Sequence, residues 1–331
     1  MVSILIPFKN TARFLPECLD SIRAQTTDSW EVIAVDDHST DDSFQILTKI
    51  AKIDTRIKVV KNSGQGIIPA LRTAYTYALG DHITRMDSDD IMKPDRISSM
   101  VESLQEFGQG HVAVGQVKYF SDRGISDGYD RYEKWLNQLT SKGQNYTEIY
   151  KECVIPSPCW MVHRADFDSC GGFAPNRYPE DYDLTFRFYE QRLSVIPCNK
   201  ILHLWRDYDT RTSRTHEHYA QNYFLDIKLH YFLRLDYDAN RPLVVWGAGY
   251  KGKTIARKLI DQGVNFTWLC DNPNKINKKI YGKQMLHFKA LLGLQRPQSI
   301  ITVANEKAQL EIKDYLKGMG SESMRDYFFF C

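Results

Sequence analysis

The sequence lacks the features that mark several classes of protein. Nowhere does it contain the run of about eighteen apolar residues that a membrane-spanning helix needs. Its seven cysteines are scattered, odd in number and never in a Cys-x-x-Cys pair, which argues against a zinc site and against a disulfide framework. Charge of one sign is not in excess either, because 43 basic residues stand beside 41 acidic ones. This balance argues against a general nucleic-acid-binding protein.

The composition that remains is that of an ordinary globular protein. Hydrophobic residues make up 43% of the 331 residues and charged residues 25%, which excludes a disordered chain and a coiled coil. The first segment has no basic stretch and reaches Pro7 too early for a signal peptide. Together with the scattered cysteines, these features predict a cytoplasmic protein with reduced thiols.

Strands and helices alternate along the first hundred residues. Short apolar runs at residues 3–6, 31–35, 57–60 and 81–86 predict strands, and apolar residues recur with helical spacing between them. This order predicts an α/β fold with a mostly parallel sheet and helices on both of its faces. Ligands of such sheets bind at the carboxyl ends of the strands.

The rest of the chain divides into a less regular middle and a second α/β segment. In the middle we expect a strand at 111–120, helices at 129–140, 181–191 and 216–235, and an irregular segment at 153–163. The aromatic stripe of the last helix favours packing on a core, with peripheral attachment to the inner face of a membrane as the alternative. Strands predicted at 243–246, 266–270, 300–303 and 327–330 restart the α/β pattern. We therefore expect two domains, residues 1–237 and 241–331.

Two groups of acidic residues stand where predicted strands end. Asp36 and Asp37 follow the second strand, and Asp87 and Asp89 follow the fourth. Since the carboxyl ends of parallel strands share one edge of a sheet, these side chains can face one pocket. Carboxylates gathered in this way repel one another unless a cation intervenes, and Mg²⁺ or Mn²⁺ binds through one or two carboxylates plus substrate phosphates. The alternative is that residues 87–90 form only a turn and a helix cap.

Ordered motifs within residues 1–215 resemble those of family 2 inverting glycosyltransferases of the GT-A fold. They are Ser3–Asn10, Val35–Asp41, Arg85–Asp90 with Pro94–Arg96, Gly171–Phe173 and Glu180–Asp183. The resemblance implies a nucleotide-diphosphate sugar as donor, with a UDP-sugar favoured. It also implies transfer with inversion to a hydroxyl of a glycan or lipid-linked acceptor, in the synthesis of a surface polysaccharide.

The resemblance also implies roles for single residues. Asp181 is implied as the catalytic base, Asp37 as a hydrogen-bond acceptor from the nucleotide base, and Pro7 as part of the pocket around that base. Asp89 is implied as a ligand of Mn²⁺ or Mg²⁺, and Asp87 as a holder of the ribose or of the metal shell. The other residues expected around the nucleotide sugar are Phe8, Asn10, Asp36, Gly64, Arg72 (at the diphosphate), Arg85, Ser88 and Glu180.

The chain departs from the family pattern at two places. Lys9 stands where many members have an aromatic residue that stacks on the base. Tyr208 stands where many members have a histidine, in the segment Trp-Arg-Asp-Tyr. The third metal ligand is therefore His216 or Asp207, or the metal is held by Asp89, donor oxygens and water alone.

A glycine-rich loop lies between the first predicted strand and the first predicted helix of the second domain. Gly247, Gly249 and Gly252, with Asp271 at the end of the next strand, match the sequence context of a dinucleotide-binding loop. The segment is near half the length of a full dinucleotide-binding fold and resembles small Rossmann-like modules appended to sugar transferases. Nucleotide binding and a structural or oligomerising role both stay open.

Two other functions are alternatives. A sugar-phosphate nucleotidyltransferase shares the early strand and helix order, but it needs a glycine-rich loop after the first strand, and residues 7–13 contain no glycine. A non-catalytic protein that binds nucleotide sugars fits a site without the family's histidine. As partners we expect a nucleotide-diphosphate sugar, a glycan or lipid-linked acceptor and, as an option, a second copy of the chain, but no nucleic acid.

Overall fold

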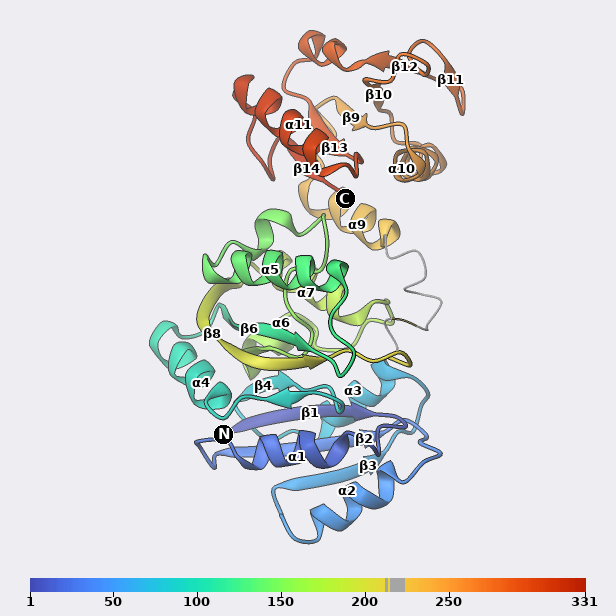
Figure 1. Ribbon diagram of the computed structural model, residues 1–331. Helices are drawn as coiled ribbons and strands as arrows, with labels where there is room; N and C mark the ends of the chain where they lie inside the picture. Colours follow the sequence, from blue (N-terminus) through green and yellow to red (C-terminus); the bar gives the residue numbers. More distant parts are fainter. Residues whose placement is uncertain (212–213, 215–223) are drawn as a thin grey trace. The chain divides into compact units, whose positions relative to one another are not determined.

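The apolar runs of the first hundred residues form one half of an eight-stranded sheet in the computed structural model (Figure 1). The structure describes residues 1–211, 214 and 224–331. β1 (Val2–Phe8), β2 (Trp30–Asp36), β3 (Ile57–Lys61) and β4 (His82–Arg85) pair in parallel in the order β3-β2-β1-β4. All four predicted strands are present, and their carboxyl ends lie at one edge of the sheet.

The other half of the sheet is mixed, and three of its four strands were not predicted from the sequence. It continues in the order β7 (Trp160–His163), β6 (His111–Phe120), β8 (Ser194–Arg206) and β5 (Ile91–Met92). β7 pairs antiparallel with β4 and with β6. The expectation of an irregular segment at 153–163 was therefore wrong for its last residues. A four-residue strand after two prolines is too short to show a pattern, and its pairing on both sides decides its conformation.

Helices cover the faces of this sheet. They are α1 (Leu15–Arg23), α2 (Ser43–Ala51), α3 (Ile67–Tyr77), α4 (Arg96–Phe107), α5 (Asp127–Ser141), α6 (Arg164–Ser169) and α7 (Glu180–Glu190). The short turn η1 (Asn145–Glu148) follows α5 in the chain. In α1 the residues at helical spacing, among them Leu19 and Ile22, are fully buried. Each such side chain contributes about 1.5–3 kcal/mol by its burial.

A second, six-stranded sheet follows in the chain. Its order is β11 (Lys279–Ile280), β12 (Lys283–His287), β10 (Thr267–Cys270), β9 (Leu243–Trp246), β13 (Gln298–Ile301) and β14 (Tyr327–Phe329). Only β11 and β12 pair antiparallel; the other neighbours are parallel. α10 (Tyr250–Asp261), α11 (Glu306–Gly318) and η4 (Phe288–Gly293) connect these strands. The predicted strands of the second domain are therefore confirmed.

Two compact units result, and their limits differ from the predicted domains. The first comprises residues 1–145 and 154–216, and the second comprises 146–153 and 217–331. The described part of the helix expected at 216–235, which is α9 (Leu225–Tyr231) and the π-helical η3 (Phe232–Asp236), belongs to the second unit.

Aromatic packing explains this division. The ring of Phe232 meets that of Phe328 edge to face at 4.9 Å between centroids, and Tyr150 stacks on Phe330 at 5.3 Å. Residues that the sequence analysis assigned to the first domain thus share a core with the last strand of the chain. No helix among the described residues is long and apolar enough to cross a membrane.

Candidate functional site

One guanidinium joins two motifs that lie far apart in the sequence. Arg85, the last residue of β4, is buried and donates from Nη1 to Glu180 Oε1 at 2.8 Å. Its Nε and Nη2 donate to Asp87 Oδ1 at 3.0 and 2.9 Å. Since Glu180 is the first residue of α7, the carboxyl end of β4 and the start of α7 meet at this arginine.

Three carboxyl groups gather just beyond β4, and we call Asp87, Asp89 and Asp90 the carboxylate cluster. Burial disfavours the charged form of Asp87, but Arg85 together with Arg211 and His203 outweighs burial and lowers the pKa of that carboxyl. Burial and the charges of Asp90 and Asp87 raise the pKa of Asp89 to about 7. Burial and Asp87 raise the pKa of Asp90 as well. The cluster therefore holds more negative charge than its buried surroundings neutralise.

Asp90, which the sequence analysis did not assign, is held by a buried network. Arg96 donates from Nη1 to His203 Nδ1 at 3.0 Å, so that Nε2–H of His203 donates to Asp90 Oδ2 at 2.9 Å. Burial and the charge of Arg96 lower the pKa of His203 well below its usual value, which keeps the ring neutral. The Arg206 backbone N–H donates to Asp90 Oδ1 at 2.7 Å. Besides Asp90 itself, Arg96 was a member of this network that the sequence offered as a signal, because its Pro-Asp-Arg motif follows the acidic motif after three residues.

Tyr208 contacts the cluster from the place of the family's histidine. Its hydroxyl donates to Asp89 Oδ2 at 2.8 Å. Burial and the charge of Asp89 raise the pKa of this phenol above its usual range, so it stays a neutral donor. Asp207, one of the proposed metal ligands, is instead paired with Arg214 by two hydrogen bonds of 2.7 and 2.6 Å. His216 lies outside the described residues.

Arg211 is a second site residue that the sequence analysis missed. Its guanidinium carbon lies 5.1 Å from the centroid of Trp205 and 6.0 Å from that of Tyr119, two rings that stack on each other. Burial alone would lower the pKa of Arg211, but Tyr119 and the carboxylate cluster raise it above its ordinary value. The positive charge of Arg211 therefore faces the carboxylate cluster, and the stacked rings of Trp205 and Tyr119 pack against its guanidinium.

Asp181 lies at the amino-terminal end of α7. Its Oδ1 accepts a hydrogen bond of 2.8 Å from the backbone N–H of Tyr182. Burial and the neighbouring carboxyl of Glu180 raise the pKa of Asp181 to about 7, while Arg85 opposes them. Glu180 Oε2 is buried with no hydrogen-bond partner among the described residues. A carboxyl group with a pKa near neutrality next to an unsatisfied oxygen is suited to taking up a proton.

The ends of β1 and β2 form the other side of the site. Asp37 Oδ1 accepts from Asn62 Nδ2 at 2.7 Å and from the N–H of Gly66 at 2.8 Å. Lys9, in place of the expected aromatic residue, reaches Asp37 Oδ2 at 3.7 Å. Asp37 is thus oriented by its neighbours, and Asn62 is a further residue that the sequence analysis missed.

The neighbouring predicted residues have mainly supporting contacts. Asp36 Oδ1 accepts from the N–H of Ser39 at 3.0 Å, and Asn10 Oδ1 accepts from the N–H of Thr40 at 2.7 Å. Phe8 is only 2% exposed, so its side chain belongs to the core and only its backbone can face a ligand. Pro7 is half-buried and Ser88 is buried.

Arg72 and Gly64 belong to loops that shape the site. Arg72 Nε donates to the carbonyl of Phe173 at 2.7 Å, and its Nη2 donates to Ala174 O and Asn176 Oδ1. This guanidinium therefore holds the loop before α7, and its contact with a diphosphate stays a prediction. The N–H of Gly64 donates to Asn62 Oδ1 at 3.0 Å.

The donor set at the carboxylate cluster fits a hard divalent cation. Asp89 and Asp87 offer oxygen ligands, and a cation bound there would favour the charged form of Asp89, whose pKa burial and the neighbouring carboxylates raise. Among the described residues, no group of three or more His, Cys, Asp and Glu has the arrangement of a complete metal site. A cation held here therefore needs ligands beyond these side chains, such as phosphate oxygens and water.

The glycine-rich loop of the second unit connects β9 to α10. Gly247 has φ +128°, and a Cβ at Gly252 would lie 2.2 Å from the carbonyl oxygen of Gly247. A Cβ at Gly249 would meet nothing within 4 Å, so one side of the loop is open. Asp271 is exposed after β10. Nucleotide binding at this loop stays a prediction.

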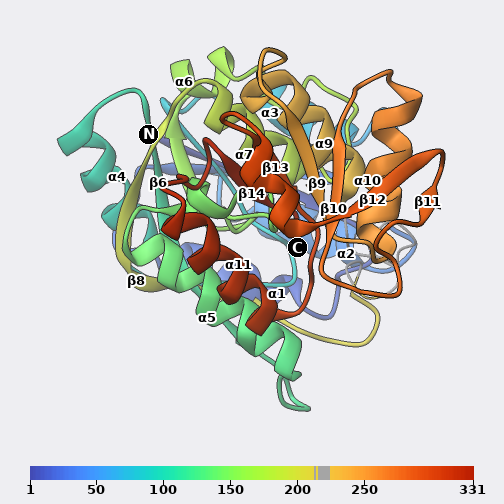
Figure 2. The ribbon, with the colours of Figure 1, turned by 90° about the horizontal axis from the view of Figure 1, so that it is seen from above.

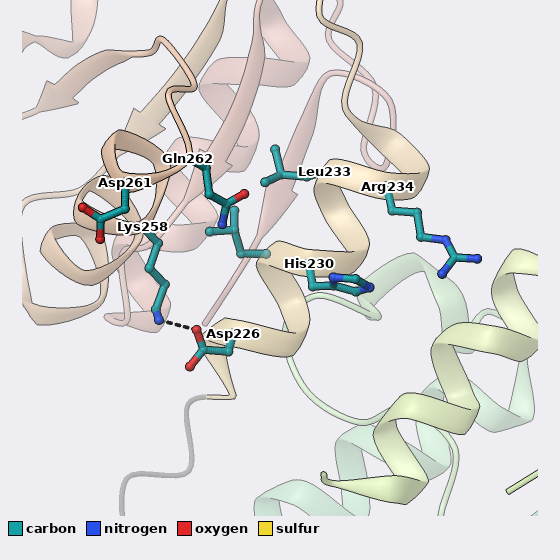
Figure 3. Close-up of a pocket in the computed structure, with 8 residues that line it drawn as sticks. Asp226, His230, Leu233, Arg234, Lys258, Asp261 and Gln262 are labelled. Atoms are coloured by element: carbon teal, nitrogen blue, oxygen red, sulfur yellow. Dashed lines mark ion pairs between the residues drawn. The ribbon is translucent and has the colours of Figure 1, made fainter. Parts of the chain in front are cut away.

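A groove of about 470 Å³ also lies in the second unit, between α9 with η3 and α10 (Figure 3). An ion pair between Asp226 and Lys258 spans it. It contains none of the motif residues, so it is not the candidate site of the first unit.

Comparisons with known proteins identify similar sequences. Residues 3–171 match the family model described as "Glycosyl transferase family 2". The chain is 36% identical over 217 residues to glycosyltransferase GlyG of Streptococcus pneumoniae, which covers 62% of this chain and 70% of that protein. Glycosyltransferase GlyA of the same organism is 27% identical, with 62% and 30% covered, and the chondroitin synthase of Pasteurella multocida is 34% identical, with 61% and 21% covered. The chain thus spans less than a third of the length of these two relatives.

Solved structures share the fold. TarS of S. aureus, in complex with UDP-GlcNAc, superimposes with a TM-score of 0.56 at 20% identity and covers 72% of this chain and 68% of that chain. The mannosyltransferase PcManGT of Pyrobaculum calidifontis, in complex with GDP-Man and Mn2+, has a TM-score of 0.50 at 19% identity, with 70% and 63% covered.

Proposed function

Because the chain belongs to glycosyl transferase family 2, we propose that its first unit transfers a sugar from a nucleotide-diphosphate donor to an acceptor hydroxyl, with inversion at the anomeric carbon. A UDP-sugar is the favoured donor, and the acceptor is a glycan or lipid-linked glycan of a surface polysaccharide. The complex of TarS with UDP-GlcNAc and the name of the chondroitin synthase support these two assignments.

The observation that carries the proposal is the junction at Arg85. This arginine connects Asp87 after β4 with Glu180 at the start of α7, which supports a shared site for their neighbours Asp89 and Asp181. The nucleotide end of a donor would lie along Asp37, and the diphosphate along the carboxylate cluster. Arg211 also faces this cluster, and we assign it to the diphosphate.

Asp89 and Asp87 would hold Mn²⁺ or Mg²⁺, which when bound supplies positive charge to the leaving diphosphate. The chain's own residues then have separate tasks. Asp181 accepts the proton of the acceptor hydroxyl while that oxygen forms its bond to the anomeric carbon. The bond from that carbon to the phosphate oxygen breaks, and its electron pair leaves on the diphosphate. Arg211 stabilises the charge that develops there.

The variant Asp181→Asn tests this assignment. It keeps the size and the oxygen that accepts from Tyr182, but it cannot take up a proton. Transfer should fall by about 10²- to 10⁴-fold, as is typical when a general base is lost. Affinity for UDP with Mn²⁺, measured by calorimetry, should stay nearly unchanged.

Asp183→Asn is the matched control, because Asp183 is buried in the same helix and pairs with Arg187 at 2.8 Å. It should change stability more than the rate of transfer. Near wild-type transfer by Asp181→Asn would exclude Asp181 as the base and make Glu180 the next candidate. Wild-type protein that shows neither transfer nor donor hydrolysis with Mn²⁺ would favour a non-catalytic binding protein.

A further inference from the structure

The balanced charge of the whole chain hides two parts of opposite sign. Residues 1–240 contain 28 basic and 34 acidic residues, whereas residues 241–331 contain 15 basic and 7 acidic ones. Residues 241–290 alone contain ten basic residues and two acidic ones. Asymmetry of this kind indicates that the basic part has an anionic partner that the acidic part does not share.

Much of this excess lies at one edge of the second sheet. We call this surface the basic edge; it consists of Lys253, Arg257, Lys278, Lys279, Tyr281 and Lys283. β11 is the outermost strand of the sheet, and α10 and β11 lie close together in both views (Figure 1 and Figure 2). The guanidinium carbon of Arg257 lies 4.8 Å from the ring centroid of Tyr281, which joins the helix to the hairpin.

The charges of the basic edge are not neutralised within the unit. Elsewhere in the unit Lys258 pairs with Asp226, and Arg241 pairs with Asp326 at 2.6 Å. By contrast, none of the five basic side chains of the basic edge has a carboxylate within ion-pair distance among the residues that the structure describes. Tyr281 is 43% exposed between them. A surface with unpaired charges around an exposed tyrosine is available to a partner.

We propose that the basic edge binds the surface of a membrane that contains anionic lipids. Each basic residue near such a surface contributes about 1 kcal/mol, so five of them are enough for stable attachment. Tyrosine rings favour the boundary between lipid headgroups and acyl chains, which is where Tyr281 would lie. Lysines on an outermost strand oppose pairing with a strand of another chain, which argues against a second copy at this edge.

Binding of the full chain to vesicles tests the proposal without reference to transfer. The probe is phosphatidylcholine vesicles with about 30% phosphatidylglycerol, against vesicles of phosphatidylcholine alone, in a flotation assay at low salt. We expect binding only to the anionic vesicles. The double variant Lys278→Gln/Lys279→Gln should weaken it about 30-fold, and Tyr281→Ser should weaken it further.

The double variant Lys307→Gln/Lys317→Gln is the matched control, since it removes the same charge from exposed positions of α11. It should bind the anionic vesicles nearly as the wild type does. Equal weakening by the control would show unspecific attraction and overturn the proposal. Binding to heparin or to RNA without binding to the vesicles would overturn it in favour of another polyanion. Because the readout is flotation, loss of transferase activity would leave this result unaffected.

Discussion

At the scale of residues, the chemistry of the site is decided by unequal environments of similar carboxyl groups. Arg85 lowers the pKa of Asp87, whereas burial and neighbouring carboxylates raise the pKa values of Asp89 and Asp181 to about 7. Asp87 is thereby kept charged, whereas the charge states of Asp89 and Asp181 depend on what binds next to them. Asp89 is suited to binding a cation, and Asp181 is suited to taking up a proton.

The raised pKa of Asp181 predicts how transfer depends on pH. A base must be deprotonated, so the charged fraction of Asp181 falls about tenfold for each pH unit below about 7. The rate at saturating Mn²⁺ and donor should therefore rise with pH and level off above about 7. A rate that stays constant between pH 5 and about 8 would contradict the assignment of Asp181.

Removing the charge of Arg211 should separate binding of the diphosphate from binding of the metal. Arg211→Gln should weaken UDP binding with Mn²⁺ by about 10- to 100-fold, as for the loss of a hydrogen bond to a charged group. Mn²⁺ alone should bind no more weakly, because a competing positive charge has left the carboxylate cluster. Calorimetry with UDP and with Mn²⁺ measures both. Arg214→Gln, which breaks the pair with Asp207, is the control and should leave UDP affinity nearly unchanged.

At the scale of elements, the structure distinguishes glycines that the motif treats alike. A Cβ at Gly252 would lie 2.2 Å from the oxygen and 2.8 Å from the carbon of the Gly247 carbonyl, so α10 could not approach β9. Gly252→Ala should cost about 1–3 kcal/mol of unfolding free energy, as for overpacking in a core. Gly249→Ala should be nearly neutral, because its Cβ would meet no atom within 4 Å. Urea unfolding measures both, and equal losses would contradict this role for Gly252.

At the scale of the whole molecule, two compact units with separate cores predict two thermal transitions. Phe330 is fully buried in the second unit, and Phe188 is 1% exposed in the first. Phe330→Ala and Phe188→Ala should each cost about 3–5 kcal/mol of unfolding free energy. Each should lower the midpoint temperature of the transition of its own unit. UDP with Mn²⁺ should raise only the midpoint temperature of the first unit, which is the one that Phe188→Ala lowers, because a ligand stabilises the part to which it binds. Calorimetry of the full chain distinguishes this result from a single shared transition.

Part of the fold and of the candidate site could be predicted from the sequence. The parallel strands of the first hundred residues could be predicted, because apolar runs of buried strands and helical spacing are local patterns. The acidic residues at the strand ends could be predicted as well, because carboxyl ends of parallel strands share one edge. The strand β7 could not, since only its pairing with β4 and β6 defines it.

The sequence by itself determined the family, the order of the elements of the first sheet and the types of side chain at the strand ends. Only the tertiary structure decided their charge states and partners. The start of a helix lowers the pKa of Asp181 and Glu180 raises it, and burial settled the direction. In the folded chain Arg72 donates to the loop before α7, whereas Arg211 faces the carboxylate cluster. Electrostatic energies depend on burial and on distances between residues remote in sequence, and these quantities exist only once the chain has folded.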